Sequence, residues 1–458
     1  MYTSPSLDHL EIMGNHPLNG EVQIRGAKNA ISKLLVASML SSHLHTFFNV
    51  PNIQEVEITL QLCKAAGMQA YWDREDGVIT AQTKQITSAT IPMSFSGSNR
   101  LPILLLGALL TRTRETITIP ALGGCNIGKR SIDFHLLALR ALGAEIEEVQ
   151  TGKGFVYKAR NAQGLTGTTI NLPYPSVMAT ENAILAATHA EGETVIKNGA
   201  IEPEVSNLIL FLQKIGVNIS IKENRSIHVQ KTTHFHPTEH FVVTDRIEAA
   251  SYGMAAIATK GRVFVKGAKK QDMTSFLNAL RSSGGEFKTF DEGIEFFYTK
   301  PLIGGVHIET DVHPGFLTDW QQPFAVLLTQ AKKPSIIHET VYENRFGYIE
   351  ALREMGVKAQ LFTDCLGPST CRFHGKNHLH SLIIQGGATL KGGNIQIPDL
   401  RAGFAYVMAA LIAPEKSHLF GLNYLERGYE CVAKKLITLG AKCKKVTAKE
   451  PLPAVAAV

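Results

Sequence analysis

The sequence predicts a mixed α/β fold of two domains, each built from three copies of a strand-and-helix unit. First, a helix ending of the form Leu, three residues, Gly and then a strand-like stretch occurs six times, at intervals of about 75 residues. Second, six Ala- and Leu-rich helical stretches open on polar residues with the same period. Third, 458 residues with 44% hydrophobic and 19% charged content are typical of a globular chain of this organisation.

The six helix endings mark the repeats in order along the chain. Glycine is expected at each of them because the residue just past a helix often adopts the left-handed conformation. One copy is a residue longer than the others. A break in the pattern at residues 231–237 predicts a hinge between Gln230 and Thr244. The glycines are Gly67, Gly143, Gly216, Gly284, Gly356 and Gly440.

The six apolar helices are expected to be buried along their length and to present their first turns to a surface or a site. Any single polar opening is explained by an ordinary helix cap. Six in register predict that several helix starts, which carry partial positive charge, converge on a cleft suited to phosphates. The openings are Lys28 and Asn29, Asn99 and Arg100, Glu181 and Asn182, Asp245 and Arg246, Thr318 and Asp319, and Asp399 with Arg401.

A glycine-rich loop at 122–130 places one thiol beside two adjacent cations. It lies between a predicted strand at 116–120 and a predicted helix at 132–142. Neighbouring positive charge stabilises a thiolate, so Cys125 is a candidate reactive thiol. An unreactive loop cysteine remains the alternative on this segment alone.

The same loop also matches the phosphate-binding pattern G-x-x-x-x-G-K, from Gly123 to Lys129. The pattern requires Ser or Thr next, to hold magnesium, but the residue is Arg130. No strand of four apolar residues ending in Asp supplies the second metal-holding element. A nucleotide hydrolase is therefore disfavoured.

Charge and hydropathy exclude several classes of function. The formal net charge of +6 is modest, and no basic block or aromatic-interleaved basic run indicates nucleic-acid binding. The longest apolar run, 101–110, is far shorter than the roughly 20 residues of a membrane span. The N-terminus carries no secretory signal pattern, and the six cysteines form no disulfide framework, so we expect free thiols in a reducing cytoplasm.

A cysteine- and histidine-rich segment, 365–380, raises the question of a zinc site. Five residues separate its two cysteines where structural zinc sites usually have two to four, and no second pair follows. We therefore expect a loop with surface histidines and no metal. The residues concerned are Cys365, Cys371, His374, His378 and His380.

Eight motifs, in order and at compatible spacing from about Leu10 to Val446, resemble the bacterial UDP-N-acetylglucosamine 1-carboxyvinyltransferase family of enolpyruvyl transferases. Any one of them is weak alone, but eight in order are specific. They are Gly26-Ala-Lys-Asn-Ala30, Gly124-Cys125 with Arg130, Asp133 and His135, Pro175-Ser-Val-Met-Ala-Thr-Glu-Asn182, Asp245-Arg-Ile-Glu248, Thr318-Asp-Trp-Gln321, Glu343-Asn-Arg345, Asp399-Leu-Arg401 and Arg427-Gly-Tyr429.

The resemblance implies an inside-out α/β barrel of six βαβαββ-type units, three in each of two domains. Because the family's chain crosses twice between its domains, one domain is expected at 28–243 and the other at 1–27 plus 244–458. The first would carry the cysteine loop and the second the aspartate base. The resemblance implies no cofactor and no metal, and neither it nor the sequence indicates an oligomeric state.

The family reaction transfers the enolpyruvyl group of phosphoenolpyruvate to the 3-hydroxyl of UDP-N-acetylglucosamine and releases phosphate, the first committed step of peptidoglycan precursor synthesis. By resemblance, Cys125 is the general acid and the target of fosfomycin, and Asp319 is the base. Arginine and lysine suit the phosphate and carboxylate of phosphoenolpyruvate. The residues expected to bind phosphoenolpyruvate are Lys28, Asn29, Arg130, Arg401 and Arg427, of which Lys28, Arg130 and Arg427 also count as catalytic.

The nucleotide sugar would be held by a larger set of matched positions. Met178 stands where the family often has glycine, which puts the nucleotide specificity in doubt. The closest rival is 3-phosphoshikimate 1-carboxyvinyltransferase, which has the same fold and donor. His135, Glu202, Arg345 and Asp399 are expected to support the charged network. The expected sugar-nucleotide contacts are Arg100, Arg130, Ser131, Ile132, Asp133, Phe134, Tyr174, Pro175, Ser176, Val177, Asp319 and Val341.

Overall fold

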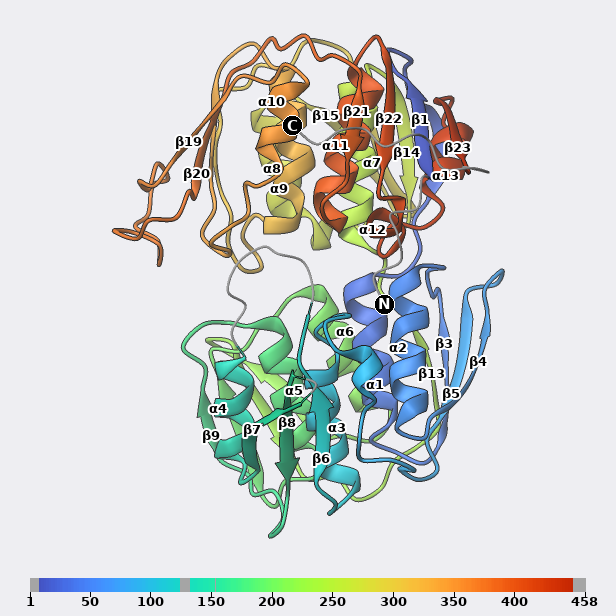
Figure 1. Ribbon diagram of the computed structural model, residues 1–458, viewed down its shortest axis with the longest axis vertical. Helices are drawn as coiled ribbons and strands as arrows, with labels where there is room; N and C mark the ends of the chain where they lie inside the picture. Colours follow the sequence, from blue (N-terminus) through green and yellow to red (C-terminus); the bar gives the residue numbers. More distant parts are fainter. Residues whose placement is uncertain (1–7, 124–131, 153, 448–458) are drawn as a thin grey trace. The chain divides into compact units, whose positions relative to one another are not determined.

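The computed structural model describes residues 8–123, 132–152 and 154–447, and their contacts divide them into two units (Figure 1). The N-terminal unit comprises the described residues between 25 and 245, and the C-terminal unit comprises 8–24 and 246–447. The start of the chain therefore belongs with its end. Figure 1 shows this directly, because the blue strand β1 (His9–Met13) lies beside the red strand β22 (Lys416–Phe420), with which it pairs antiparallel.

The N-terminal unit alternates helices with short strands throughout. Its helices are α1 (Lys28–Ser38), α2 (Gln54–Ala65), the 3-10 turn η1 (Met93–Phe95), α3 (Pro102–Arg112), α4 (Asp133–Ala141), α5 (Val177–Ala187) and α6 (Pro203–Lys214). Its strands are β3 (Leu44–Phe48), β4 (Gln69–Asp73), β5 (Val78–Gln82), β6 (Ile117–Pro120), β7 (Glu145–Thr151), β8 (Gly154–Arg160), β9 (Thr169–Asn171), β10 (Glu193–Lys197), β11 (Ile219–Lys222), β12 (Ser226–Gln230) and β13 (Thr238–Phe241).

The C-terminal unit follows the same alternation. Its helices are α7 (Arg246–Ala258), η2 (Lys270–Asp272), α8 (Thr274–Ser282), η3 (Thr318–Trp320), α9 (Gln321–Thr329), α10 (Ile349–Glu354), α11 (Leu400–Ile412), α12 (Leu422–Glu426) and α13 (Val432–Thr438). Besides β1 and β22, its strands are β2 (Asn19–Gln23), β14 (Arg262–Lys266), β15 (Glu286–Phe290), β16 (Gly293–Phe297), β17 (His307–Glu309), β18 (Ser335–His338), β19 (Ala359–Phe362), β20 (Ser381–Ile384), β21 (Asn394–Gln396) and β23 (Lys442–Val446).

The strands form six small sheets, three in each unit, and five of them share one pattern. In each of the five, counted from one edge, the first two strands are parallel and the next two pairings are antiparallel. In the order β17-β18-β20-β19, for example, β17 and β18 are parallel, and β20 is antiparallel to both β18 and β19. The sixth sheet, β6-β8-β7, has three strands, and its parallel edge is reduced to a bridge between Thr90 and Thr118. The repeat predicted from the sequence is therefore a repeat of sheet topology.

Each sheet is backed by one apolar helix, and these helices form the interior of their unit. In the C-terminal unit α7, α9 and α11 pack against one another, and every residue of α7 is buried. In the N-terminal unit α3 packs between α1 and α5. Burying such helices all round removes most of their apolar surface from water, the main stabilising contribution to each unit. The predicted fold class, sheets around central helices with three repeats per unit, is confirmed.

The expected helix ends are also confirmed, and two details need correction. All six repeat glycines have positive φ, between 91° and 118°. However, Glu181 and Asn182 do not open their helix, because α5 begins at Val177 and both residues are fully buried in its second turn. The break at 231–237 contains no regular element, but β13 beyond it pairs with β3, so the division between the units follows Asp245.

Candidate active site

In the N-terminal unit, the cation Lys28 stands at the first position of α1, half-buried. Its ammonium lies 3.8 Å from the Glu55 carboxylate, and its backbone N–H donates to Asp245 Oδ2 at 3.2 Å. Glu55 is buried on α2 and also accepts a long bond, 3.4 Å, from the Asn99 amide. Glu55 thus connects the starts of α1 and α3, a role that the sequence did not reveal because Glu55 lies inside an ordinary amphipathic helix.

Two further helix starts carry the residues expected to hold the sugar nucleotide. Ile132 precedes α4 and is buried, Asp133 is exposed in its first turn, and Phe134 packs against the core. Residues 174–177 form a partly exposed run that leads into α5, with Ser176 at the N-cap position. Arg100, just before α3, is partly buried. Met178 is partly buried, and its side chain packs against the hydrophobic core.

His135, predicted to support the charged network, is a buried histidine that links helices. It is buried on α4, and its Nδ1 accepts from the Asn182 amide at 3.2 Å. Asn182 also donates to the Ile103 carbonyl and accepts from the Gly107 N–H, both at 3.1 Å. Burial, together with the charge of Arg100, lowers the pKa of His135 to about 3, so the ring stays neutral. The pair therefore ties α3, α4 and α5 together.

Beside this pair, Glu181 is a buried carboxyl held in its protonated form. Among the described residues neither of its oxygens has a hydrogen-bond partner, and the side chain is fully buried. Burial raises its pKa to about 8, against the attraction of Lys33 and with the repulsion of Glu202 and Glu204. Glu202, predicted to support the charged network, is the buried residue that precedes α6.

In the C-terminal unit, Asp319 lies between two arginines. It sits in η3, just before α9, with 19% of its side chain exposed. Arg345 forms an ion pair with Oδ1, and the Nε of Arg401 lies 3.2 Å from Oδ2. Both guanidiniums are almost fully buried, at 2% and 5% side-chain exposure. The two guanidinium groups stabilise the ionised form of the Asp319 carboxylate.

The arginines are themselves held in place by further carboxylates. Burial opposes the charge of Arg345, but Asp319, Asp399 and Glu339 raise its pKa. Asp399 caps α11, accepting from the N–H groups of Arg401 and Ala402 at 2.8 and 3.1 Å. This confirms the helix start at Asp399 that the polar opening predicted, and it orients the Arg401 backbone.

Glu339, which the sequence did not single out, is a buried carboxylate beside the turn that carries Asp319. Its buried carboxylate accepts from Thr318 Oγ1 and Gln321 Nε2, both at 2.8 Å, on the two sides of Asp319. It also accepts from the N–H groups of Val341 and Tyr342. Four hydrogen bonds to one buried carboxylate fix the turn that carries Asp319. Nothing in the local sequence marks Glu339, because the two side chains that it holds, Thr318 and Gln321, lie about 20 residues away.

The remaining predicted residues of this unit are Val341 and Arg427. Val341 is buried, and its carbonyl accepts from Arg372. Arg427 follows α12 and is partly exposed. The guanidinium of Arg401 lies 5.6 Å from the ring centre of Tyr429, whose hydroxyl shares a hydrogen bond with Ser251.

The described residues of the predicted site are thus divided between the two units, and most of them lie at or near helix starts. Cys125, Arg130 and Ser131 lie outside the described residues. Among the helices that the structure describes, none is long and apolar enough to cross a membrane.

Solved structures with the same fold are enolpyruvyl transferases. The chain superposes on the enolpyruvyl transferase NikO from Streptomyces tendae with a TM-score of 0.83, at 24% identity and covering 97% of this chain and all of that one. It superposes on EPSP synthase from Acinetobacter baumannii with a TM-score of 0.74, at 17% identity, covering 96% and 100%. These likenesses define the fold as that of the enolpyruvyl transferases.

Sequence comparison narrows the class. The model of the EPSP synthase (3-phosphoshikimate 1-carboxyvinyltransferase) family matches residues 12–436. The UDP-N-acetylglucosamine 1-carboxyvinyltransferase of Protochlamydia amoebophila is 56% identical over 440 residues, 96% of this chain and 95% of that one. Those of Chlamydia pneumoniae and Zymomonas mobilis are 51% and 36% identical, over 94% and 96% of this chain and 94% and 100% of theirs. The chain belongs to the EPSP synthase family, within its UDP-N-acetylglucosamine 1-carboxyvinyltransferase branch.

Proposed function

We propose that this protein transfers the enolpyruvyl group of phosphoenolpyruvate to the 3-hydroxyl of UDP-N-acetylglucosamine and releases inorganic phosphate. The observation that carries the proposal is Asp319, a partly exposed carboxylate between two buried arginines, in a chain 56% identical to an enzyme of that name. A carboxylate held as an anion at a surface is suited to accept the hydroxyl proton as the sugar oxygen attacks. We propose Asp319 as that base.

The donor brings a phosphate and a carboxylate, so its site needs fixed cations. We propose Lys28 and Asn29 of the N-terminal unit, and Arg401 and Arg427 of the C-terminal unit, as contacts for phosphoenolpyruvate. Arg401 is already paired and buried, so its orientation costs little to hold when an anion binds. Arg130 would join them from outside the described residues.

Addition also needs a proton at the methylene carbon of phosphoenolpyruvate. We propose that the Cys125 thiol donates it while the sugar oxygen bonds to the adjacent carbon, which gives a tetrahedral intermediate. Loss of that proton and of phosphate then restores the double bond in the product. The cations neutralise the charge of the departing phosphate, as preorganised charges do in phosphate chemistry.

The sugar nucleotide is proposed to lie along the starts of α4 and α5. Helix starts offer backbone N–H groups and partial positive charge, which suit a diphosphate. Its contacts would be Arg100, Ile132, Asp133, Phe134, residues 174–177 and Val341, with Ser131. We propose the two units as the two domains of the enzyme, the N-terminal one carrying the Cys125 loop and the C-terminal one the base.

A phosphate-release assay tests the reaction. We expect release that requires both phosphoenolpyruvate and UDP-N-acetylglucosamine, and none with either alone. Shikimate 3-phosphate in place of the sugar nucleotide is the decisive comparison, because the family description covers that acceptor as well. Release from phosphoenolpyruvate with shikimate 3-phosphate, but not with UDP-N-acetylglucosamine, would overturn the proposed acceptor.

The thiol has its own test. Fosfomycin is expected to add to Cys125, detected by mass spectrometry on the peptide spanning residues 123–129. Cys443, partly buried with a pKa that burial raises to about 11, serves as the internal control for non-specific alkylation. Equal labelling of both thiols, or none at Cys125, would contradict the proposed role.

A further inference from the structure

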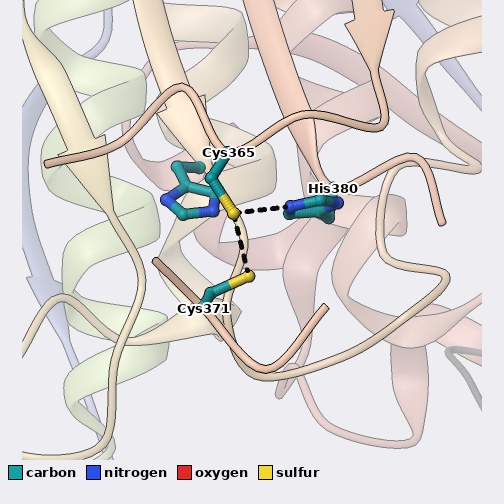
Figure 2. Close-up of side chains that lie close together, drawn as sticks. Cys365, Cys371 and His380 are labelled. Atoms are coloured by element: carbon teal, nitrogen blue, oxygen red, sulfur yellow. Dashed lines mark hydrogen bonds between the residues drawn. The ribbon is translucent and has the colours of Figure 1, made fainter. Parts of the chain in front are cut away.

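Away from the proposed active-site residues, four potential metal ligands meet at one end of the sheet β17-β18-β20-β19. They are His338, Cys365, Cys371 and His380, and their ligand atoms all lie within 4.8 Å of one another. Figure 2 shows the Cys365 sulfur facing both the Cys371 sulfur and the His380 ring. The two sulfurs are 3.6 Å apart, and Cys365 Sγ lies 3.3 Å from His380 Nε2.

The strand register brings these residues together. His338 is the last residue of β18 and lies opposite Ser381, the first residue of β20, so His380 comes just before that pair. β19 ends at the same edge of the sheet, and the chain leaving it supplies the two cysteines. Two histidines on strand ends and two thiols on the connecting loop therefore share one corner.

The distances fit a tetrahedral metal site. With metal–sulfur bonds of about 2.3 Å and metal–nitrogen bonds of about 2.0–2.1 Å, tetrahedral geometry separates two sulfurs by about 3.7 Å and sulfur from nitrogen by about 3.5 Å. The separations of 3.6 and 3.3 Å lie close to both values. They are far longer than the bond of about 2.05 Å in a disulfide.

Both histidines are oriented as metal ligands are. His338 Nδ1 forms a hydrogen bond with Glu309 Oε2 at 2.9 Å, and His380 Nδ1 donates a hydrogen bond to the His378 carbonyl at 2.8 Å. Partners of this kind fix the ring and direct the other nitrogen, Nε2, at the metal. His338 is fully buried, and among the described residues its Nε2 has no hydrogen-bond partner. An unsatisfied buried nitrogen costs free energy that a bound cation would recover.

The loop is packed against this corner too closely to be an ordinary surface loop. A Cβ on Gly367 would lie 2.1 Å from His338 Nδ1 and 2.2 Å from Glu309 Oε2. The Phe373 N–H donates to Cys371 Sγ at 3.3 Å, a contact that orients the sulfur. Glycine at 367 lets the backbone close over the histidine and its carboxylate partner.

We propose that His338, Cys365, Cys371 and His380 bind one zinc ion in a closed, structural site. Two thiolates and two imidazoles in tetrahedral arrangement select Zn²⁺ over magnesium, calcium or manganese, and four protein ligands leave no position for a substrate. The sequence argued against a metal because it showed one widely spaced cysteine pair. The other two ligands are His380, from the same segment as the cysteines, and His338, from another strand. His374 and His378 are not among the four ligands.

The ion would stabilise the segment that holds the proposed base. His338 is followed by Glu339, whose carboxylate fixes the turn around Asp319. Cys371 is followed by Arg372, which donates to the Val341 carbonyl. Zinc would thus fasten the loop after β19 to the strand end that carries Glu339, and its effect on turnover would be indirect.

Metal analysis of the full-length protein tests this directly and does not depend on its activity. Protein purified with a thiol reductant and without chelator is expected to contain about one zinc per chain by mass spectrometry. Cys365→Ser and His338→Gln should lose the metal. His374→Gln and Cys443→Ser, a histidine on the same loop and a thiol in the same unit, are matched controls that should keep it.

Cobalt substitution covers the case in which the ligand variants fail to fold. Wild-type apoprotein given Co²⁺ is expected to show the intense ligand-field bands of tetrahedral cobalt together with sulfur-to-cobalt charge transfer. Zinc below about one-tenth per chain with an octahedral cobalt spectrum would overturn the proposal. So would equal zinc in wild type and Cys365→Ser, or recovery of Cys365 and Cys371 as a disulfide from reductant-treated protein.

Discussion

The two units share one architecture but manage buried charge in opposite ways. In the C-terminal unit the carboxylate of Asp319 is balanced by two buried arginines and backed by a fully hydrogen-bonded Glu339. In the N-terminal unit Glu181 is buried without a hydrogen-bond partner among the described residues and stays protonated, and His135 stays neutral. Repetition of the fold therefore does not repeat the electrostatics of the interior.

The difference has a physical reason. A buried ion is tolerated only when it is paired and hydrogen-bonded, and otherwise the group changes its protonation state. The C-terminal unit keeps ionised groups at its helix starts by pairing Asp319 with Arg345 and Arg401. The N-terminal unit holds the buried Glu181 and His135 in their neutral forms, while Lys28, at the partly exposed start of α1, is paired with Glu55. Three measurements probe this contrast and a fourth compares one repeat glycine from each unit, in order of decreasing expected effect.

Asp319→Asn should have the largest effect, because it removes the proposed base while keeping the shape of the side chain. We expect turnover to fall by about 10²- to 10⁴-fold, with phosphate release as the measurement. Asp291→Asn, on an exposed turn of the same unit, is the control and should be silent. Undiminished turnover in folded Asp319→Asn protein would remove Asp319 from the mechanism.

Arg345→Met tests the charge balance itself. Removing one partner of a buried ion pair is expected to lower the free energy of unfolding by about 3–5 kcal/mol, measured by urea denaturation. Lys445→Met breaks an exposed pair with Glu426 in the same unit and should cost less than about 1 kcal/mol. Equal losses in the two variants would mean that the buried ion pair contributes no more to stability than an exposed one.

Glu181→Gln tests, through the pH dependence of stability, whether this buried carboxyl is neutral in the folded protein. The folded pKa of about 8 lies above the ordinary value of 4.5 for a glutamate, so between these two pH values the folded state retains a proton that the unfolded state releases. Wild-type stability should therefore fall as pH rises from about 5 to 8, by roughly 3 kcal/mol.

The glutamine variant should lack this fall, so its advantage over wild type should be smallest at pH 5 and largest at pH 8. Unfolding curves at several pH values measure it. Glu223→Gln, at an exposed turn of the same unit, should leave the pH dependence unchanged. A parallel pH dependence in Glu181→Gln and wild type would show that Glu181 ionises normally.

The smallest effect compares one repeat glycine from each unit. Both have a φ near +98°, so alanine is strained at either position, by about 1 kcal/mol. At Gly143 a Cβ meets its nearest atom at 3.5 Å, whereas at Gly356 it would lie 2.8 Å from the Thr389 carbonyl oxygen. Thermal unfolding should therefore rank Gly356→Ala below Gly143→Ala, and the reverse order would mean that backbone strain alone sets the cost.

Much of the architecture could be read from the sequence because it depends on local signals. Helix-ending glycines, apolar helices and polar helix openings recur with one period, and each is set by a few neighbouring residues. The exception is instructive: Glu181 and Asn182 were polar residues in an apolar run, but Ser176 and Val177 begin the helix. Asn182 is polar because it connects α5 with α3 and α4, and not because it opens a helix.

The sequence by itself determined the repeats, the fold class and the family, since these depend on patterns that one chain displays along its length. It also placed Asp319, Arg345 and Arg401 among the candidate site residues, through motif resemblance. Only the tertiary structure decided which groups share an environment: Glu339 with both sides of Asp319, Glu181 without a partner, and His338 with two cysteines and His380. Pairing across strands joins residues distant in the chain, and burial sets their charge, so neither is written in any local stretch.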